Sequence, residues 1–314
     1  MIFLKKYIVA AIFCITLPVS ANTIFELVVP NPPGGSTDIV GRYVAKILND
    51  ANIPTVVQNR AGAQGTIGVK SVAKTSNIQN TLLLLGTGPG LYAPLMMDPA
   101  PYNVQDDFEI ITTVASDSIV VIVSGSSKIK TAKQLVQAIK TAKAPLRYGH
   151  GAMNQKFASI VFLNKIQGHA IEVPFNGAAP TVFAVASESL EFGFVNYTDT
   201  KEFAKSGRVR IIGIASKQRR NDILNVKTFV EQGIEFDQQA WFTLAAPKGM
   251  DKNTIMRLNA VVTDALKNDK TSYVATEMIP MHSSVPGAKI FIDTQYKTYR
   301  PLIEKFKELS TTNN

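Results

Sequence analysis

The segment Gly34-Gly35-Ser36-Thr37 is the first place in this chain where residue types and spacing could do chemistry. It stands between an apolar run at residues 25–29 and a helical pattern of apolar residues at 38–49. A helix begins with unpaired N–H groups and about half a unit of positive charge. Glycine admits a ligand close to the backbone, and a hydroxyl can cap the helix or donate a hydrogen bond. The segment therefore predicts an anion site for carboxylate or phosphate, with an ordinary capped turn as the alternative.

The sequence offers no convincing set of catalytic or metal-binding residues. Its three histidines are His150, His169 and His282, and no Gly-x-Ser-x-Gly nucleophile motif occurs. His and Cys pairs with metal-ligand spacing are absent, and residues 86–90 lack the glycine spacing of a dinucleotide fingerprint. We therefore expect a binding protein rather than an enzyme, with no cofactor and no metal. An exported hydrolase or transferase is the alternative.

The first 21 residues have the three regions of a secretory signal peptide. Lys5 and Lys6 form the basic region, residues 7–17 the apolar region, and residues 19–21 (Val-Ser-Ala) a cleavage site. The apolar run also holds Cys14, the one cysteine of the chain, so the exported protein has no disulfide. We predict export through the Sec pathway to the periplasm, with an uncleaved N-terminal anchor as the alternative.

Charge and composition favour a soluble protein that attracts small anions. The net charge is +9, and removal of Lys5 and Lys6 with the signal peptide leaves +7. Because the Lys and Arg residues are scattered and no basic-aromatic stripe occurs, nucleic acid is not an expected partner. The remaining chain of about 290 residues is long enough for one or two domains with an ordinary core.

Predicted strands and helices alternate along the chain, and the alternation then starts again. In the first half three strands are each followed by a helix: 25–29 and 38–49, 55–58 and 66–74, 81–85 and 91–97. After a helix at 131–141, four strands alternate with three helices: 146–148, 154–166, 171–173, 178–187, 192–195, 198–205 and 210–215. Such alternation is typical of parallel sheets covered on both faces, so the predicted fold class is α/β.

The restart predicts two α/β halves joined by two crossing connections. Apolar runs at 109–114 and 119–123 would lead out of the first half, and residues 239–246 would lead back. Residues 251–309 have helical spacing for most of their length. Ligands of such sheets bind outside the carboxyl ends of the strands. The loops expected there are rich in glycine, amides and hydroxyls and poor in charge: 31–37, 59–68, 86–90, 148–154 and 175–180.

A series of motifs covers nearly all of the chain beyond the signal peptide, in a fixed order. They lie at residues 29–42, 57–68, 173–180, 207–216 and 231–247, and the second (Val-Gln-Asn-Arg-Ala-Gly-Ala-Gln-Gly-Thr-Ile-Gly) is the most specific. Together they resemble the Bug-type periplasmic receptors of tripartite tricarboxylate transporters. The resemblance implies a two-domain periplasmic binding protein of type II-like, flytrap form, with two crossing strands and a helical C-terminal part.

The resemblance also implies a function. Such a receptor captures a small carboxylate (a di- or tricarboxylate, an amino acid or an aromatic acid) and delivers it to integral membrane transporter subunits. We expect domain 1 at residues 22–121 plus 245–314, domain 2 at 122–244, and a monomer that closes by a hinge motion. A periplasmic sensor that feeds a two-component system, and a phosphate- or phosphonate-binding protein, are the alternatives. The sequence does not indicate which carboxylate binds or whether a cation accompanies it.

Residues of both domains are expected to bind the ligand. In the family, backbone N–H groups and waters of a first-domain loop hold the ligand carboxylate, and that loop corresponds here to residues 31–38. The opposing loop resembles residues 149–154. The full expected set is Asn31, Gly34, Gly35, Ser36, Thr37, Asp38, Thr87, Gly88, His150, Gly151, Ala152, Met153, Asn154, Phe175, Asn176 and Asn196.

Three of the side chains near this site allow more specific expectations. Asn31 stands where the family usually has an aromatic residue, so it would either bond a polar ligand group or cap the turn. Asp38 and Arg42 are four residues apart on one helix and predict a local ion pair. Trp241, on the return connection, is expected to fill core rather than to support the hinge.

Overall fold

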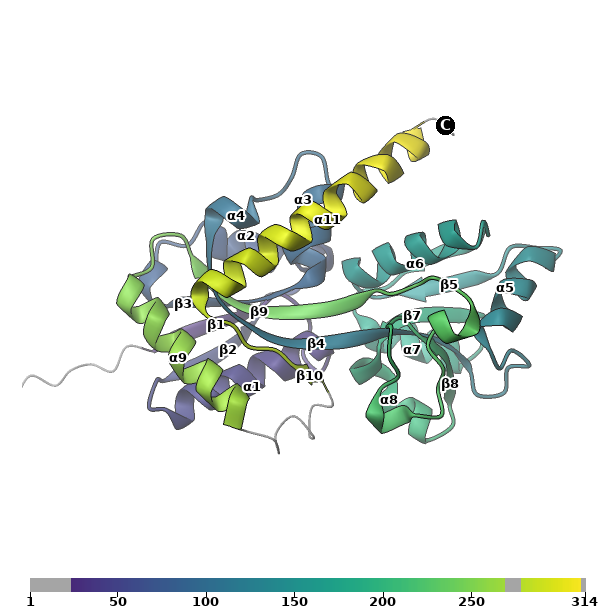
Figure 1. The fold of residues 1–314 in the computed structure, drawn as a ribbon, viewed down its shortest axis with the longest axis horizontal. Helices are drawn as coiled ribbons and strands as arrows, with labels where there is room; N and C mark the ends of the chain where they lie inside the picture. The colour runs from purple at the N-terminus through teal and green to yellow at the C-terminus, as the bar shows by residue number, and fades with distance from the viewer. Residues whose placement is uncertain (1–23, 269–277, 312–314) are drawn as a thin grey trace, which may run out of the picture.

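The computed structural model describes residues 24–268 and 278–311, which form two bodies joined by two long strands (Figure 1). We call the body on the left of Figure 1 the first lobe and the body on the right the second lobe. In the first lobe β1 (Phe25–Val29) lies between β2 (Thr55–Asn59) and β3 (Thr81–Gly86), and all three are parallel. Every residue of β3 is buried, as a strand covered on both faces requires. The predicted signal peptide at residues 1–21 lies outside the described residues.

The two lobes are linked by β4 (Phe108–Ser124) and β9 (Gln239–Pro247). The runs predicted separately at 109–114 and 119–123 are one 17-residue strand. It stays extended between them because β9 pairs with it as far as Ser118, and β7 and β8 take over from Ile119 and Val120. The sheets are parallel as predicted except at these crossing strands, because the chain leaves the first lobe along β4 and returns along β9. Strand β9 is therefore antiparallel to both β3 and β4.

The second lobe repeats the pattern of strands and helices. Strand β5 (Arg147–His150) is parallel to β6 (Ile171–Pro174) and to β7 (Phe192–Asn196). Strand β4 is antiparallel to β7 and to β8 (Val209–Ile214). The carboxyl ends of β5, β6 and β7 face the first lobe, so the loops after them are available to a shared site.

Helices cover both sheets. The longer ones are α1 (Ser36–Asp50), α2 (Thr66–Ala73), α5 (Ala132–Thr141), α6 (Met153–Lys165), α7 (Ala178–Ala186), α8 (Tyr197–Lys205), α9 (Lys252–Asn268) and α11 (Val285–Thr311). The helix predicted at 91–97 is instead a π-helical turn, η3 (Gly88–Tyr92), followed by the short α3 (Ala93–Met96). Pro94 lacks the N–H group that the fourth residue of a helix beginning at residue 91 would donate.

The remaining short elements are η1 (Ala63–Gly65), η2 (Ile78–Asn80), α4 (Val104–Asp107), η4 (Asn221–Ile223), η5 (Val230–Gln232) and β10 (Ile279–Pro280). Strand β10 pairs antiparallel with β4 and brings the segment before α11 back to the first lobe. Helix α11 then runs along the outside of that lobe and packs against β4 (Figure 1).

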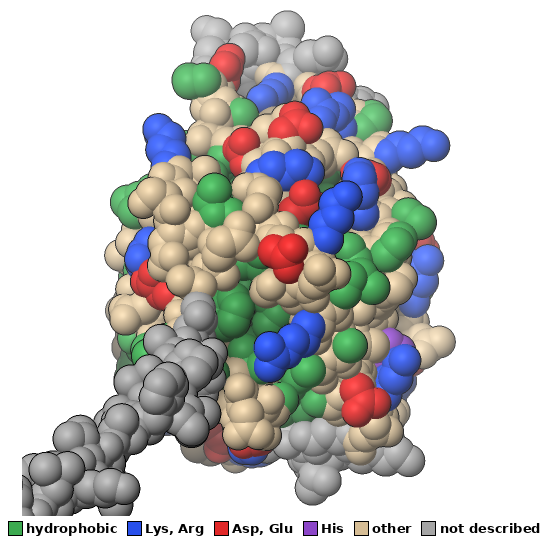
Figure 2. Space-filling model, turned by 90° about the vertical axis from the view of Figure 1, so that its left-hand side faces the viewer, with side chains coloured by type: hydrophobic (Ala, Val, Ile, Leu, Met, Phe, Trp, Pro, Cys, Tyr) green, Lys and Arg blue, Asp and Glu red, His purple; other side chains and the backbone are tan. Residues whose placement is uncertain are grey.

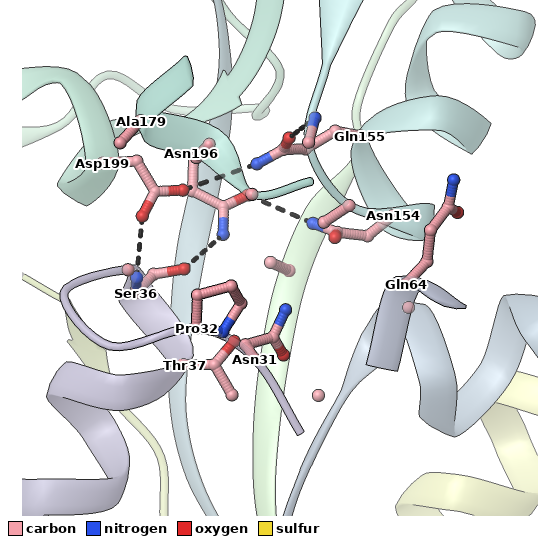
Figure 3. A pocket seen from close by; sticks show the side chains of 18 of the residues that line it. Asn31, Pro32, Ser36, Thr37, Gln64, Asn154, Gln155, Ala179, Asn196 and Asp199 are labelled. Carbon is pink, nitrogen blue, oxygen red and sulfur yellow. Dashed lines mark hydrogen bonds between the residues drawn. The ribbon is translucent and has the colours of Figure 1, made fainter. Parts of the chain in front are cut away.

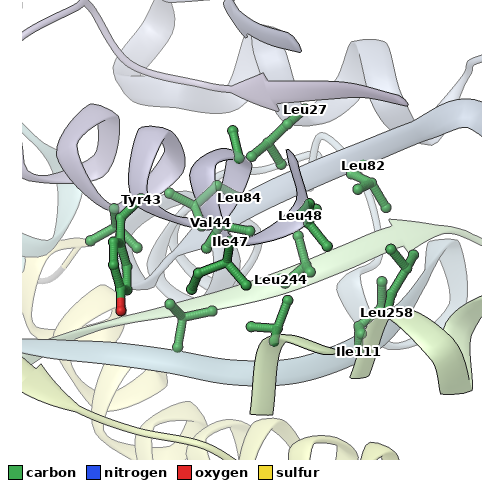
Figure 4. Packing of buried hydrophobic residues seen from close by; sticks show 14 of the residues in the cluster. Leu27, Tyr43, Val44, Ile47, Leu48, Leu82, Leu84, Ile111, Leu244 and Leu258 are labelled. Atoms are coloured by element: carbon green, nitrogen blue, oxygen red, sulfur yellow. The ribbon is translucent and has the colours of Figure 1, made fainter. Parts of the chain in front are cut away.

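Apolar side chains of α1 anchor the first lobe. Val44, Ile47 and Leu48 lie on one face of α1 and pack against Leu27 and Leu84 of the sheet (Figure 4). Each such side chain is at most 7 % exposed, and its burial is worth about 1.5–3 kcal/mol. This face fixes the start of α1 relative to the sheet, and thereby the position of the Gly-Gly-Ser-Thr segment.

Aromatic side chains fill the core of the second lobe. Phe162 of α6 meets Phe194, Phe229 and Phe236 at centroid distances of 5.6, 5.5 and 5.4 Å. All three pairs are edge-to-face, the geometry that aromatic rings prefer. Because Phe162 lies nine residues into α6, this cluster holds the start of that helix at the edge facing the first lobe.

Charges are mixed on the end of the first lobe, where Lys and Arg side chains alternate with Asp and Glu side chains (Figure 2). Such a mixed face gives no concentrated basic field of the kind that nucleic acid requires. Among the helices of the described residues, none combines the length and the apolar character needed to cross a membrane.

Candidate functional site

A pocket with a cavity volume of about 180 Å³ lies between the two lobes. Figure 3 shows the side chains that surround it, with those of α8 and β7 facing those at the start of α1. From the first lobe it is lined by Asn31, Pro32, Pro33, Gly34, Gly35, Ser36, Thr37, Gln64, Gly86, Thr87, Gly88 and Pro89. From the second lobe it is lined by Gly151, Ala152, Asn154, Gln155, Asn176, Gly177, Ala178, Ala179, Pro180, Asn196 and Asp199. Ala240 and Phe242 of the crossing strand β9 complete the wall.

Asp38 holds the first-lobe loop in place from behind. Its carboxylate accepts hydrogen bonds from the backbone N–H of Gly34 and from Nδ2 of Asn59, each at 2.9 Å. Nε of Arg42 lies 2.8 Å from the same carboxylate, which confirms the predicted ion pair. Burial raises the pKa of Asp38, but the hydrogen bonds from Arg42, Gly34 and Asn59 outweigh it and leave that pKa below its ordinary value. The loop is therefore preorganised without any contact of Asp38 with the cavity.

Three buried polar side chains join the lobes across the pocket (Figure 3). Nδ2 of Asn196 donates to Oγ of Ser36 at 2.8 Å, and Nδ2 of Asn154 donates to Oδ1 of Asn196 at 3.1 Å. The exposed fractions of Ser36, Asn154 and Asn196 are 5, 6 and 4 %. Asn196 thus connects the start of α1 in the first lobe to the start of α6 in the second.

The starts of α6 and α7 both face the cavity. Their N-cap residues, Ala152 and Gly177, have no side chain that accepts from the first-turn N–H groups. Gly151 and Gly177 lie so close that a Cβ on Gly151 would fall 2.0 Å from the carbonyl oxygen of Gly177. This close approach places the first turns of both helices on one wall. Unpaired N–H groups and the positive ends of two helices are therefore directed at the pocket.

Thr87 and Gly88 form the floor between the lobes. The hydroxyl of Thr87 bonds the backbone of Trp241 on β9, both as a donor to the carbonyl oxygen and as an acceptor from the N–H. A Cβ on Gly88 would lie 3.2 Å from the backbone nitrogen of Asn154, so glycine permits the close approach of α6. Thr87 thus lines the pocket while its hydroxyl ties β3 to the crossing strand.

Asp199 is the one ionisable residue among those that line the pocket. Its Oδ1 accepts a 2.7 Å hydrogen bond from the backbone N–H of Ser36, and Nε2 of Gln155 lies 3.4 Å from its Oδ2. Burial, and after it the nearby carboxylate of Asp117, raise the pKa of Asp199 to about 7 against the opposing effect of the N–H groups of Ser36 and Asn196. No Lys, Arg or His side chain of the described part of the chain belongs to the wall.

Asp117 lies beneath Asp199 on β4 and is fully buried. Oδ2 of Asp117 accepts from the backbone N–H of Thr198 at 3.2 Å, and Nη1 of Arg220 lies 3.6 Å from Oδ1. Burial raises the pKa of Asp117 to about 6, while the charge of Arg220 and the bonds from Thr198 and Ser118 oppose the rise. A second negative group thus stands behind Asp199, on the crossing strand.

Twelve of the sixteen residues expected to bind ligand line the pocket. They are Asn31, Gly34, Gly35, Ser36, Thr37, Thr87, Gly88, Gly151, Ala152, Asn154, Asn176 and Asn196. Asp38, as described above, supports the loop from behind. The other three, His150, Met153 and Phe175, lie beside the pocket in packed surroundings.

His150, Met153 and Phe175 do not reach the cavity because each is engaged elsewhere. The His150 side chain is fully buried and its Nε2 lies 2.9 Å from Oε1 of Glu172. That bond, with Lys156, lowers the pKa of Glu172 to about 2 against the effect of burial. Met153 packs on the apolar cluster around Phe157, and Phe175 packs on the cluster around Val182. Which of these side chains turn away from the cavity depends on the packing around them, which residue type alone does not reveal.

Gln64, Gln155 and Asp199 line the pocket but were not predicted from the sequence. The sequence contains one signal for Asp199, which is its place in the first turn of the helix after a strand that ends at the cleft. An acidic residue is nevertheless not expected in a site for an anionic ligand, because it repels the ligand. Gln155 is 1 % exposed, and its Oε1 accepts from the N–H of Gly151 at 2.8 Å, so it also shapes the loop.

Trp241 fills core, as predicted. It is 4 % exposed, its ring meets Phe291 edge-to-face at 5.6 Å, and Nε1 donates to Gln295 at 3.2 Å. Within residues 24–268 and 278–311, no group of three or more His, Cys, Asp or Glu side chains is placed to hold a metal ion.

Comparison with known proteins gives the context of this site. A family model described as "Tripartite tricarboxylate transporter family receptor" matches residues 40–307. Protein BugT of Bordetella pertussis is 32% identical over 302 residues, which cover 93% of each chain. Two solved structures share the fold: the R. palustris protein Rpa4515 with adipate (TM-score 0.85, 22% identity, 90% of this chain and 96% of that one) and the periplasmic binding protein BugD (TM-score 0.83, 22% identity, 90% and 96%). The predicted fold of a periplasmic binding protein is thereby confirmed.

Proposed function

Because the chain belongs to the tripartite tricarboxylate transporter receptor family, we propose that it captures a small carboxylate in the periplasm for integral membrane transporter subunits. Members of this family are receptors and not enzymes. The observation that carries the proposal is the interlobe pocket, whose wall consists of glycines, amides and hydroxyls at the starts of helices. Such donors bind a carboxylate without altering it.

The ligand carboxylate would bind on the first turns of α6 and α7. Their N–H groups have no side-chain acceptor, and two aligned helix ends give a positive potential without a cation. Thr37 faces the cavity from the other lobe, and its hydroxyl adds a donor there. A ligand held by both lobes stabilises the closed form, because it contacts the second lobe and the first lobe together only in that form.

We propose domain boundaries at 22–121 plus 245–314 and at 122–244. Supporting them, one apolar cluster of the first lobe draws on residues 25–115 and 242–278, and two clusters of the second lobe draw on residues 119–236. Closure would then bend β4 and β9 where they leave one lobe for the other. We further propose that the receptor works as a monomer.

A thermal-shift screen of the protein without its signal peptide tests this function. The ligands are mono-, di- and tricarboxylates, aromatic acids, amino acids, phosphate and phosphonates, with the matching carboxamides as uncharged controls. A ligand at 100 times its dissociation constant adds about 2.7 kcal/mol to the free energy of unfolding. We expect a carboxylate to raise the melting temperature and its amide to leave it unchanged. A shift with phosphonates alone, or turnover of any added compound, would contradict the proposal.

A further inference from the structure

The positive end of α1 is already occupied by a carboxylate of the protein itself. Asp199 reaches across from the second lobe, and its Oδ1 accepts the N–H of Ser36 at the first position of α1. A Cβ added to Gly35 would lie 3.7 Å from the same oxygen. The part of the pocket that the sequence marks as an anion site therefore presents an acidic side chain to the cavity.

Among the residues that the structure describes, this wall gives Asp199 no cationic side chain that could balance a second anion. The other lining residues are uncharged, and the charged neighbour that shifts the pKa of Asp199 is Asp117, which is also acidic. Arg220 is held at Asp117 and at Asp222, where its Nε lies 3.0 Å from Oδ1. A dianionic ligand in the cavity would therefore face Asp199 with no compensating charge.

The second oxygen of Asp199 can accept a bond from a ligand. Oδ2 lies 3.4 Å from Nε2 of Gln155, longer than an ordinary N–H···O hydrogen bond. Asp199 keeps part of its surface open to the cavity, whereas the neighbouring Asn196 is 4 % exposed. In Figure 3 its carboxylate lies between Ser36 and Gln155, above Thr37. A donor on the ligand could reach Oδ2 without breaking the bond to Ser36.

We infer that Asp199 is a specificity-determining residue that selects a zwitterionic ligand of the α-amino acid class, with the ligand ammonium on Asp199 and its carboxylate on the starts of α6 and α7. This inference rests on the proposed function, since it assigns the carboxylate to the site described above. An ammonium pairs with Asp199 by charge and by hydrogen bond. The deaminated counterpart of the same acid has no ammonium. Asp199 would then face an apolar carbon or a second carboxylate of the ligand.

The raised pKa of Asp199 agrees with this role. Burial and Asp117 favour the protonated form of the empty site, and an ammonium would favour the ionised form. Selection for amino acids should therefore be strongest at pH 8, above the pKa of Asp199.

Asp199 also has a structural role, because its carboxylate accepts a hydrogen bond from the backbone N–H of Asn196 at the start of α8. Asp199→Asn keeps the shape and an acceptor oxygen but removes the charge. Glu202→Gln, one turn further along α8, removes an exposed carboxylate that pairs with Lys205 and serves as the matched control.

The experiment measures binding of L-amino acids and their deaminated counterparts by calorimetry at pH 8. L-aspartate is compared with succinate, L-glutamate with glutarate, and each remaining amino acid that shifts the melting temperature with its own deaminated acid. We expect an amino acid to bind at least tenfold more tightly than its counterpart. The ratio of the dissociation constant of the deaminated acid to that of the amino acid should fall below about threefold in Asp199→Asn. In Glu202→Gln this ratio should be unchanged. The unliganded melting temperature of each variant shows that it folds.

Each other outcome has a definite meaning. Equal or tighter binding of the deaminated acids by the unmodified protein would overturn the inference while supporting carboxylate capture. An amino acid preference that survives in Asp199→Asn would show that another residue selects the ammonium, and would likewise overturn it. Absence of binding by every carboxylate, aminated or not, would overturn the proposed function itself.

Discussion

Oδ1 of Asp199 lies 2.7 Å from the backbone nitrogen of Ser36, although 163 residues separate them along the chain. The two residues belong to opposite lobes, so a side chain of one lobe satisfies the first turn of a helix in the other. Asn196 adds a second bond from the same region of the second lobe to Oγ of Ser36. The interlobe contact thus converges on one residue at the start of α1.

Asn196→Ala should shift the unliganded protein toward an open form. The change removes both the bond to Ser36 and the bond from Asn154. A lost hydrogen bond costs about 1 kcal/mol, which changes the ratio of open to closed molecules roughly fivefold. Small-angle scattering should show a larger radius of gyration than for the control Asn253→Ala, which alters an exposed residue of α9. An unchanged radius would mean that Asn196 does not hold the lobes together.

Thr37→Val should weaken ligand binding with little effect on stability. Valine keeps the shape of the side chain but removes a hydroxyl that faces the cavity. A hydrogen bond to a charged group is worth about 1.5–3 kcal/mol, so the dissociation constant should rise at least tenfold. Calorimetry with the ligand identified in the screen measures this. Thr294→Val, on the exposed face of α11, should leave affinity unchanged; equal affinity in both variants would remove Thr37 from the site.

Gly151→Ala should lower both stability and affinity. The new Cβ would overlap the carbonyl oxygen of Gly177, and backbone atoms cannot move away as a flexible side chain can. Such overpacking costs about 1–3 kcal/mol. Thermal unfolding should show a clear drop in melting temperature. Gly35→Ala, whose Cβ would make an ordinary 3.7 Å contact, is the control for stability. Equal melting temperatures for the two variants would contradict the close approach of the two loops.

The free energy of unfolding should fall as pH rises from about 4 to 7. The pKa of Asp199 is about 7 in the folded protein and ordinarily 3.8, so between these values the folded state holds a proton that the unfolded state has lost. Asp117, on β4 behind it, has a pKa of about 6 and acts in the same direction. This stability is fully present below pH 4 and is lost as pH rises through 7.

Asp199→Asn tests the assignment of that pH dependence. Denaturant unfolding at several pH values should give a flatter profile for the variant than for the unmodified protein. The carboxylates of Asp38 and Glu172, whose pKa values are lowered, lose their stabilising effect only below about pH 4 and do not interfere. The same slope in both proteins would show that Asp199 ionises normally.

Local sequence was sufficient for much of the fold. The apolar spacing of α1 and the buried run of β3 depend on neighbours in the chain, so both were predicted to within a few residues. It was also sufficient for the ion pair of Asp38 with Arg42, because four residues span one helical turn. The prediction failed at β4, where the extended path through Asp117 depends on pairing with β9, more than 100 residues away.

The sequence by itself determined that glycine-rich loops at helix starts would line the pocket between the lobes, because helix ends and glycines act through their own backbone. Only the tertiary structure decided which side chains enter the cavity. In the folded protein the His150 side chain contacts Glu172 instead of the cavity, and the Asp199 carboxylate accepts the N–H of Ser36. The direction of a side chain and the partner of a charge depend on residues distant in sequence, and those meet only when both lobes pack around β4 and β9.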